Sequence, residues 1–148
     1  MHDDLNRAIA KSPLPAGTAL GASGFAAARV EGGPLFLKKG AEKGPLAAFC
    51  QICTARGMGP DTSLRLMEEL LKANLPGELP QPCRISMDAE GRIWLSRTFT
   101  QEEQDAPVFP RELGAFAQGI AAHALKVRAM AEAARRDNPF DGTDGLYS

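Results

Sequence analysis

The chain has 148 residues, the size of one ordinary domain with a single core, and is too short for two well-packed domains. Apolar residues make up 44% of it and charged residues 24%, a globular composition that excludes the intrinsically disordered class. Because the net charge is -1, no overall basic field attracts nucleic-acid phosphate or an anionic membrane surface, and we expect no nucleic-acid partner.

The N-terminus and the cysteines indicate a cytoplasmic protein. Residues 1–4 lack the basic region and apolar core of a secretory signal, and no apolar run approaches the length of a membrane span, so membrane insertion is not expected. The three cysteines are an odd number in a chain with an ordinary core. We therefore predict reduced thiols and no disulfide framework.

A short helix is predicted at the start of the chain. Leu5, Ala8 and Ile9 recur at helical spacing. Asp3 and Asp4 before them favour a helix N-terminus, and two prolines a few residues later end it. Because so short a helix is marginal in water, its apolar side must dock on its own sheet or on a ligand.

Three extended runs follow, over residues 25–30, 34–38 and 46–54, separated by glycine-containing loops. Such runs predict an antiparallel meander of three strands. The alanine-rich first run is also compatible with a helix by propensity, but its flanking glycines favour a strand.

A second helix is predicted from a cap at Asp61, Thr62 or Ser63 to about Leu75. Its apolar residues span a broad arc, with one group on one side and two leucines that extend it: Leu64, Met67, Leu71 and Leu75, then Leu66 and Leu70. Since this stripe is wider than one sheet face needs, we expect the helix to pack against two surfaces, the second belonging to a partner subunit.

The clearest hairpin joins runs at 84–88 and 92–99 around the turn Asp88-Ala89-Glu90-Gly91. Asp88 and Glu90 resemble paired catalytic carboxylates, but a turn explains both residues better. The alternation assigns two faces to the second run: Ile93, Leu95, Arg97 and Phe99 on one, and Trp94, Ser96 and Thr98 on the other.

An acidic linker over residues 101–105 leads to the longest predicted helix, over 110–135. Its apolar side chains fall within one narrow arc that covers a core: Leu113, Phe116, Ala117, Ile120, Ala124, Val127 and Ala131. The polar, aperiodic tail over 137–148 is expected to be flexible. The order α-β-β-β-α-β-β-α predicts one α+β domain over residues 1–136 with an antiparallel sheet.

The search for reactive groups finds one motif, the CxxC pair Cys50 and Cys53. A redox pair lies at a helix N-terminus, whereas this pair lies in a predicted strand, where an offset of three places the sulfurs on opposite faces. A zinc site needs two more ligands, and only Cys83, His2 and His123 are available. Buried structural thiols are the favoured interpretation, and no metal or other cofactor is predicted.

No catalytic constellation accompanies the remaining candidates. His123 lies at the rim of the last helix's apolar stripe among alanines, and no nucleophile motif such as GxSxG is present to pair with it. Phosphate-cradling GxxxxGK and GxGxxG sequences are also absent. A short chain with surplus apolar surface and no such constellation favours binding over catalysis, so we expect no enzyme.

Two local sequences, and the order of the elements, resemble the class I type III secretion chaperone (Tir-chaperone) family. The first, Leu70-Leu71-Lys72-Ala73-Asn74-Leu75, is similar to the leucine-leucine-x-alanine-asparagine ending of that family's second helix. The second, Met87-Asp88-Ala89-Glu90-Gly91-Arg92-Ile93-Trp94-Leu95, is like its aspartate-x-x-glycine hairpin, and a long last helix follows. The pattern spans roughly residues 25–131.

The resemblance implies a bacterial, cytoplasmic homodimer whose interface uses the second helix and the second hairpin. This agrees with the broad stripe on the second helix. The interface residues implied are Leu64, Met67, Leu71, Ile85, Met87 and Trp94. The alternative is that all six belong to the core of one subunit.

The resemblance also implies the partner, an unfolded N-terminal segment of an effector protein that wraps around the dimer by strand addition and apolar anchoring. The residues expected to line its pockets are Leu5, Ile9, Phe25, Leu35, Leu37 and Phe49. By the same resemblance, the protein is expected to keep the effector soluble and competent for secretion without ATP, and the secretion ATPase is a second candidate partner. Two alternatives stay open: a non-secretory protein-binding regulator of the same fold, and a small thiol or zinc protein.

Overall fold

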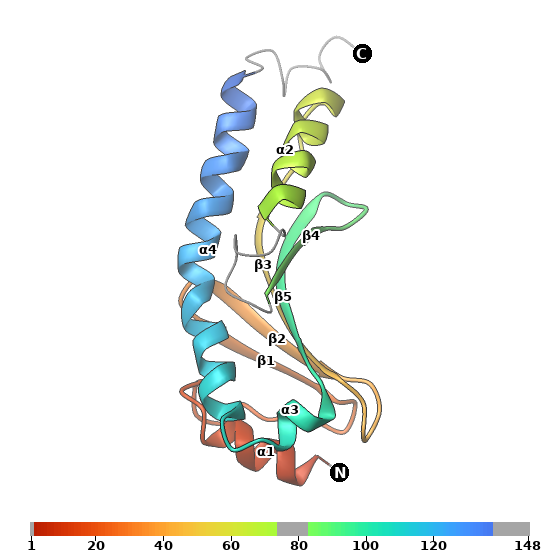
Figure 1. The fold of residues 1–148 in the computed structure, drawn as a ribbon, viewed down its shortest axis with the longest axis vertical. Helices are drawn as coiled ribbons and strands as arrows, with labels where there is room; N and C mark the ends of the chain where they lie inside the picture. Colours follow the sequence, from red (N-terminus) through yellow and green to blue (C-terminus); the bar gives the residue numbers. More distant parts are fainter. Residues whose placement is uncertain (1, 74–82, 138–148) are drawn as a thin grey trace.

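A computed structural model describes residues 2–73 and 83–137 of the chain. Within this part, one antiparallel sheet has helices on one of its faces (Figure 1). The elements in chain order are α1 (Asp3–Ala10), β1 (Phe25–Val30), β2 (Gly33–Lys39), β3 (Leu46–Thr54), α2 (Pro60–Ala73), β4 (Arg84–Met87), β5 (Arg92–Phe99), α3 (Gln101–Asp105) and α4 (Phe109–Asp137).

The sheet has five strands in the order β1-β2-β3-β5-β4. The predicted meander and the predicted hairpin are both confirmed, with β1 as a strand and not a helix. They join through β3 and β5, which pair antiparallel so that Leu46 lies opposite Phe99 and Cys50 opposite Leu95. The α+β fold class predicted from the element order is therefore confirmed.

Alternation along β3 separates a covered face of the sheet from an open one. Leu46, Ala48, Cys50 and Ile52 are buried toward the helices, while the residues between them are only partly buried. A bulge at Ile52 shifts the register, and Arg128 of α4 donates its Nε hydrogen to the freed Ile52 carbonyl at 3.0 Å. The helix layer is thus tied to the sheet at its one irregular point.

The long helix α4 covers the sheet and then runs past it to pack beside α2 (Figure 1). Its predicted apolar arc is buried from Leu113 to Ala131. The turn between β1 and β2 touches this helix at Gly32, whose φ is +104°. A Cβ atom there would lie 2.9 Å from Ile120, so only glycine permits this close approach.

The covered face carries one arginine among apolar residues, as the alternation predicts. The Arg97 side chain is only 10% exposed, and its Nη2 donates to Glu112 of α4 at 2.8 Å. Its guanidinium also lies 4.3 Å from the ring centre of Phe99, a cation–π contact. Pairing with the carboxylate makes the burial of this charge tolerable.

The segment over residues 101–105 is a helix, α3, and not the linker that its acidic composition suggests. Thr100 and Glu103 form a reciprocal capping box: the Glu103 backbone N–H donates to the Thr100 hydroxyl, and the Thr100 backbone N–H donates to the Glu103 carboxylate. The spacing of these two residues is a recognisable start signal. A helix of five residues is too short for apolar periodicity to reveal it.

Helix α1 docks on the core of its own chain, where it contacts α4. Leu5 and Ile9 are buried in the core. Asn6 fixes the helix with two hydrogen bonds to Leu20, donating to its carbonyl at 3.2 Å and accepting from its N–H at 2.8 Å. The predicted tail and Leu75 lie outside the described residues.

Candidate protein-interaction surfaces

Helix α2 buries one side and leaves an apolar stripe on the other. Leu66 and Leu70 are buried against the core, whereas Leu64, Met67 and Leu71 are 58%, 41% and 64% exposed. These three residues, which we call the α2 stripe, follow the spacing of one helix face. The broad arc expected from the sequence therefore has one buried half and one half left uncovered in the single chain.

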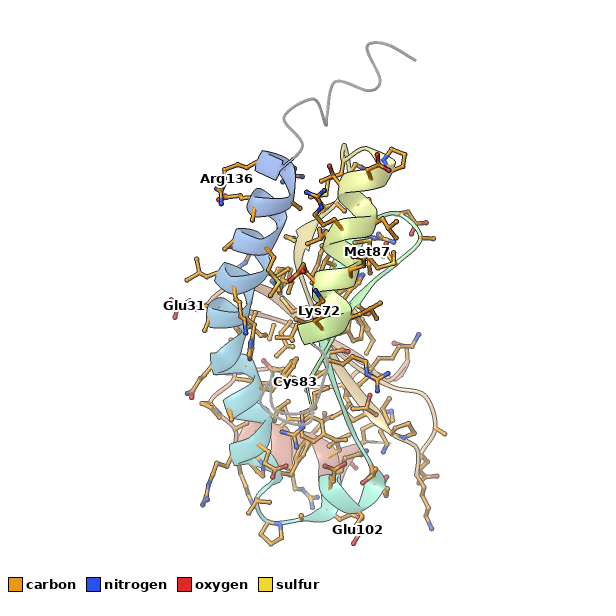
Figure 2. The ribbon with its side chains drawn as sticks, turned by 45° about the horizontal axis from the view of Figure 1, so that its top comes forward. Glu31, Lys72, Cys83, Met87, Glu102 and Arg136 are labelled. Atoms are coloured by element: carbon orange, nitrogen blue, oxygen red, sulfur yellow. The ribbon has the colours of Figure 1, made fainter. Side chains whose placement is uncertain are left out.

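The other three predicted interface residues lie elsewhere. Met87 is half-buried at the end of β4, which contacts α2 (Figure 2). Ile85 is 3% exposed, pairs with Leu95 and belongs to the core. Trp94 is on the open face of the sheet, because its side chain alternates with those of the buried Ile93 and Leu95.

Four aromatic side chains cross the open face of the sheet. Phe25 of β1, Phe36 of β2, Phe49 of β3 and Trp94 of β5 have successive ring centres 5.7, 5.6 and 5.7 Å apart. Phe25 is 42% exposed, and the other three are half-buried against one another. We call these four residues the aromatic band; it is the second large apolar surface in the described part of the chain.

The structure separates the residues predicted to line effector pockets. Leu5, Ile9, Leu35 and Leu37 are 9% exposed or less and lie in the core of the single chain, so their role in lining effector pockets stays a prediction. Phe25 and Phe49 lie on the opposite face, in the aromatic band. The six residues therefore do not form one groove. The sequence pattern marks alternate faces of each strand but not which face the helices cover.

The turn between β4 and β5 orients the tryptophan of the aromatic band. The Trp94 indole N–H donates to Asp88 Oδ2 at 3.0 Å, and the same carboxylate accepts from the backbone N–H groups of Glu90 and Arg92. These two backbone bonds are the expected turn chemistry. The bond from Trp94, then those from Arg92, lower the pKa of Asp88 from 3.8 to about 2.

Replacing Asp88 by Asn is expected to destabilise the fold at neutral pH, with no difference left in strong acid. The folded pKa of Asp88 is depressed, so its contribution is present above the unfolded pKa near 3.8 and is lost as the pH falls through about 2. Urea unfolding followed by fluorescence measures this, because Trp94 is the single tryptophan. Equal unfolding midpoints for both proteins at neutral pH would contradict the prediction.

The three cysteines lack the features of reactive thiols. Cys50 is buried, Cys53 and Cys83 are half-buried, and all three are free. Burial raises the pKa of each thiol, the reverse of what nucleophilic cysteines need. The expectation that Cys50 and Cys53 point to opposite faces is wrong: the bulge at Ile52 pairs Cys53 with the buried Ile93, on the same face as Cys50.

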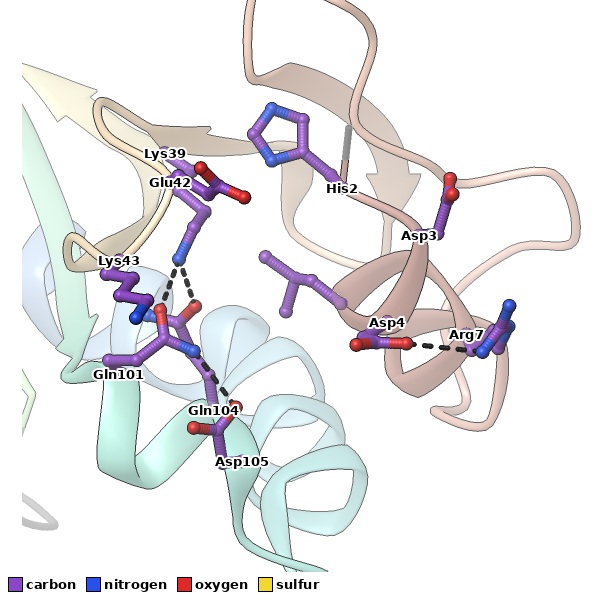
Figure 3. Close-up of a pocket in the computed structure, with 11 residues that line it drawn as sticks. His2, Asp3, Asp4, Arg7, Lys39, Glu42, Lys43, Gln101, Gln104 and Asp105 are labelled. Carbon is purple, nitrogen blue, oxygen red and sulfur yellow. Dashed lines mark hydrogen bonds and ion pairs between the residues drawn. The ribbon is translucent and has the colours of Figure 1, made fainter.

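A polar hollow lies between α1, the β2–β3 loop and α3 (Figure 3). Lys39, 4% exposed, donates from Nζ to Gln101 at 2.8 Å, Gln104 at 2.6 Å and the Gly44 carbonyl at 3.0 Å. Burial lowers the pKa of Lys39. These three acceptors match the three protons of the ammonium group, so it holds the loop to α3 and has no donor left for a ligand.

The remaining candidates for catalysis or metal binding do not form a site within residues 2–73 and 83–137. His123 is half-buried on α4, where burial and then Lys126 lower its pKa. No group of three or more His, Cys, Asp or Glu side chains is arranged to hold a metal ion within these residues. In the same ranges, no helix is both long enough and apolar enough to cross a membrane.

The fold is that of type III secretion chaperones. A chain in the crystal structure of the Yersinia pestis type III secretion chaperone SycH with a stable fragment of YscM2 aligns with a TM-score of 0.62 and 14% identity, over 86% of this chain and 99% of that one. A chain of the heterodimeric ExoU–SpcU complex from the type III secretion system of Pseudomonas aeruginosa aligns with a TM-score of 0.55 and 18% identity. This alignment covers 82% of the present chain and 95% of the other one.

These comparisons confirm the fold that the sequence resemblance implies. No protein-family model matches the chain, and no curated protein matches its sequence. At 14% and 18% identity, the similarity defines the architecture, and function has to be argued from the surfaces of this chain.

Proposed function

We propose that this protein is a non-enzymatic, cytoplasmic chaperone of class I type, which binds an unfolded segment of a type III effector. The observation that carries the proposal is the large apolar surface left over after the core is built, in the α2 stripe and the aromatic band. Apolar patches of this kind on a single chain mark protein-binding sites. The SycH and ExoU–SpcU structures are complexes with a second protein, which supports the same role here.

The α2 stripe is proposed as the dimer interface. Its three side chains lie on one helix face at the spacing that two packed helices require. A two-fold pair of such stripes is self-complementary, because each leucine meets the same apolar surface on the partner. Met87, half-buried on the strand β4 that contacts α2, is proposed to join this interface.

The sheet is proposed as the client-binding layer, with Phe25 and Phe49 retained from the predicted pocket residues. Among residues 2–73 and 83–137, the strand order leaves β1 and β4 with one unpaired edge each, and an extended segment can add backbone hydrogen bonds to such an edge. Apolar side chains of the segment then pack on the aromatic band, where Phe25 is exposed and the other three rings are half-buried. This mode needs no ATP, because burial of apolar area supplies the free energy.

A non-secretory regulator that binds another protein through the same surfaces is the second candidate. Both candidates share the dimer interface and the client-binding layer, so the identity of the partner separates them. A role for the secretion ATPase as a second partner also belongs to the chaperone hypothesis alone.

Purification of the tagged protein from its native host, followed by identification of bound proteins, tests the function. We expect a stoichiometric partner bound through its N-terminal segment, which becomes insoluble or is degraded when the chaperone gene is deleted. Recovery of a folded transcription factor or another regulator as the stoichiometric partner would support the second candidate. A preparation with no bound protein, and an effector that stays soluble without the chaperone, would refute the proposed function.

A further inference from the structure

The five strands contain no acidic residue. Their open face instead carries basic side chains beside the aromatic band. The register places Lys38 beside Phe25 and Arg29 beside Pro34 on this face, while Arg84 pairs with Ser96 in the same row as Phe49. All three basic side chains are exposed. The open face therefore combines an apolar strip with positive charge, although the whole chain has a net charge of -1.

These three cations have no hydrogen bond or ion pair within the described residues. Arg92, the fourth cation of this face, differs because its guanidinium pairs with Asp88 at 2.7 Å and Glu90 at 3.2 Å. Unpaired charges of one sign around an apolar patch attract a surface of the opposite sign and give it orientation. An acidic partner would supply a counter-charge that the described residues do not give.

We propose, on the basis of the chaperone function above, that the open face binds an extended client segment in which apolar residues are flanked by Asp and Glu. The apolar side chains pack on the aromatic band, and the carboxylates pair with Arg29, Lys38 and Arg84. Charge complementarity selects this occupant among polypeptides. The proposal thus names the chemistry of the client segment that this chaperone recognises.

A second copy of the same face is a poor occupant. Face-to-face packing of two open faces would bring two sets of unpaired cations together, and like charges across an interface are repulsive. The α2 stripe is different, because Leu64, Met67 and Leu71 carry no charge. The two apolar surfaces therefore serve different partners.

A nucleic acid is also a poor occupant, although aromatic rings with basic neighbours are found in single-strand binding sites. Base stacking needs free ring faces. Here the rings pack against one another: Phe25 and Phe36 are stacked with planes 26° apart, Phe36 and Phe49 are tilted by 36°, and Trp94 meets Phe49 edge-on at 68°. A closed row of rings offers an apolar strip and not separate stacking platforms.

The test measures binding of a fluorescein-labelled peptide to the full chain by anisotropy. The probe has a central cluster of leucine, isoleucine and valine flanked by Asp and Glu, and a matched peptide carries Lys at each acidic position. Trp94, the single tryptophan, reports contact with the band independently. We expect the acidic peptide to bind at least about tenfold more tightly than the basic one, with a change in Trp94 emission.

A pair of triple variants localises the binding. Reversal of the open-face cations, by Arg29→Glu, Lys38→Glu and Arg84→Glu, is expected to weaken binding of the acidic peptide about tenfold or more. The control reverses three exposed cations of α4, by Arg111→Glu, Lys126→Glu and Arg136→Glu, with the same change in net charge. We expect its binding to change by less than about threefold. Far-UV circular dichroism verifies that both variants are folded.

Several outcomes would overturn the inference. With the peptides, these are equal affinity for the acidic and the basic peptide, no binding of the acidic peptide, and an equal loss of affinity in both triple variants. With other ligands, the overturning result is saturable binding of an oligothymidylate or of anionic lipid vesicles that the open-face variant loses and the control variant keeps. If the open-face variant still co-purifies its native client, this inference fails while the proposed chaperone function stands. If neither the wild type nor the variant retains a client, the proposed function itself fails.

Discussion

Replacing Leu71 by Asp is expected to convert the protein from a dimer of twice 15.8 kDa to a monomer of 15.8 kDa, measured by light scattering. Leu71 is the most exposed member of the α2 stripe, so the substitution leaves the core of one subunit intact. In the proposed dimer the carboxylate would be buried without a counter-charge. An unpaired buried charge costs several kcal/mol, so we expect the dimer dissociation constant to rise by more than about a hundredfold.

Leu125 provides the matched control, because it is another exposed leucine on a helix, 69% exposed on α4. Leu125→Asp adds the same charge outside the α2 stripe and is expected to leave the dimer unchanged. A wild-type monomer at micromolar concentration would exclude the proposed dimer. Dissociation by both substitutions, or by neither, would place the interface away from the α2 stripe.

Replacing Phe99 by Ala is expected to lower the free energy of unfolding by about 3 to 5 kcal/mol, a large part of the stability of a domain this size. Phe99 is fully buried where β5 ends. Its ring lies edge-on to that of Phe109 of α4, with the two ring centres 5.1 Å apart. Its backbone carbonyl accepts from Gln104 of α3 at 2.9 Å. Loss of the ring leaves a cavity where the sheet, α3 and α4 meet.

The same substitution at Phe25 is the control, because that ring is 42% exposed and lies in the aromatic band. We expect Phe25→Ala to cost no more than about 1 kcal/mol. Urea unfolding followed by circular dichroism gives both values. Similar losses at the two positions would mean that the aromatic band is as well packed as the core, and would remove the argument that it is free for a partner.

The local elements were largely predictable. The strand Leu46–Thr54 has the same bounds in sequence and structure, and the hairpin around Asp88 forms as its turn residues predict. The broad apolar arc of α2 indicated a second packing surface, and the structure leaves Leu64, Met67 and Leu71 uncovered. Each of these features depends on residues close together in the chain, which is why periodicity and turn chemistry could reveal them.

The features that the sequence did not predict depend on contacts between residues far apart in the chain. Nothing near Leu35 or Leu37 indicates that α4 covers their face of the sheet and leaves Phe36 open. The bulge at Ile52, which moves Cys53 to the face of Cys50, is stabilised by Arg128, 76 residues away. Even the short helix α3, which carried a local capping signal, is held to the β2–β3 loop through Lys39.

The amino-acid sequence alone determined the number of strands, the broad arc of α2 and the resemblance to secretion chaperones, because these follow from hydrophobic period and local motifs. Only the tertiary structure decided that β3 pairs with β5, that the helices cover one face, and that four aromatic rings and three exposed cations share the other. The reason is that alternation distinguishes the two faces of a strand, whereas the packing of distant elements decides which face stays exposed.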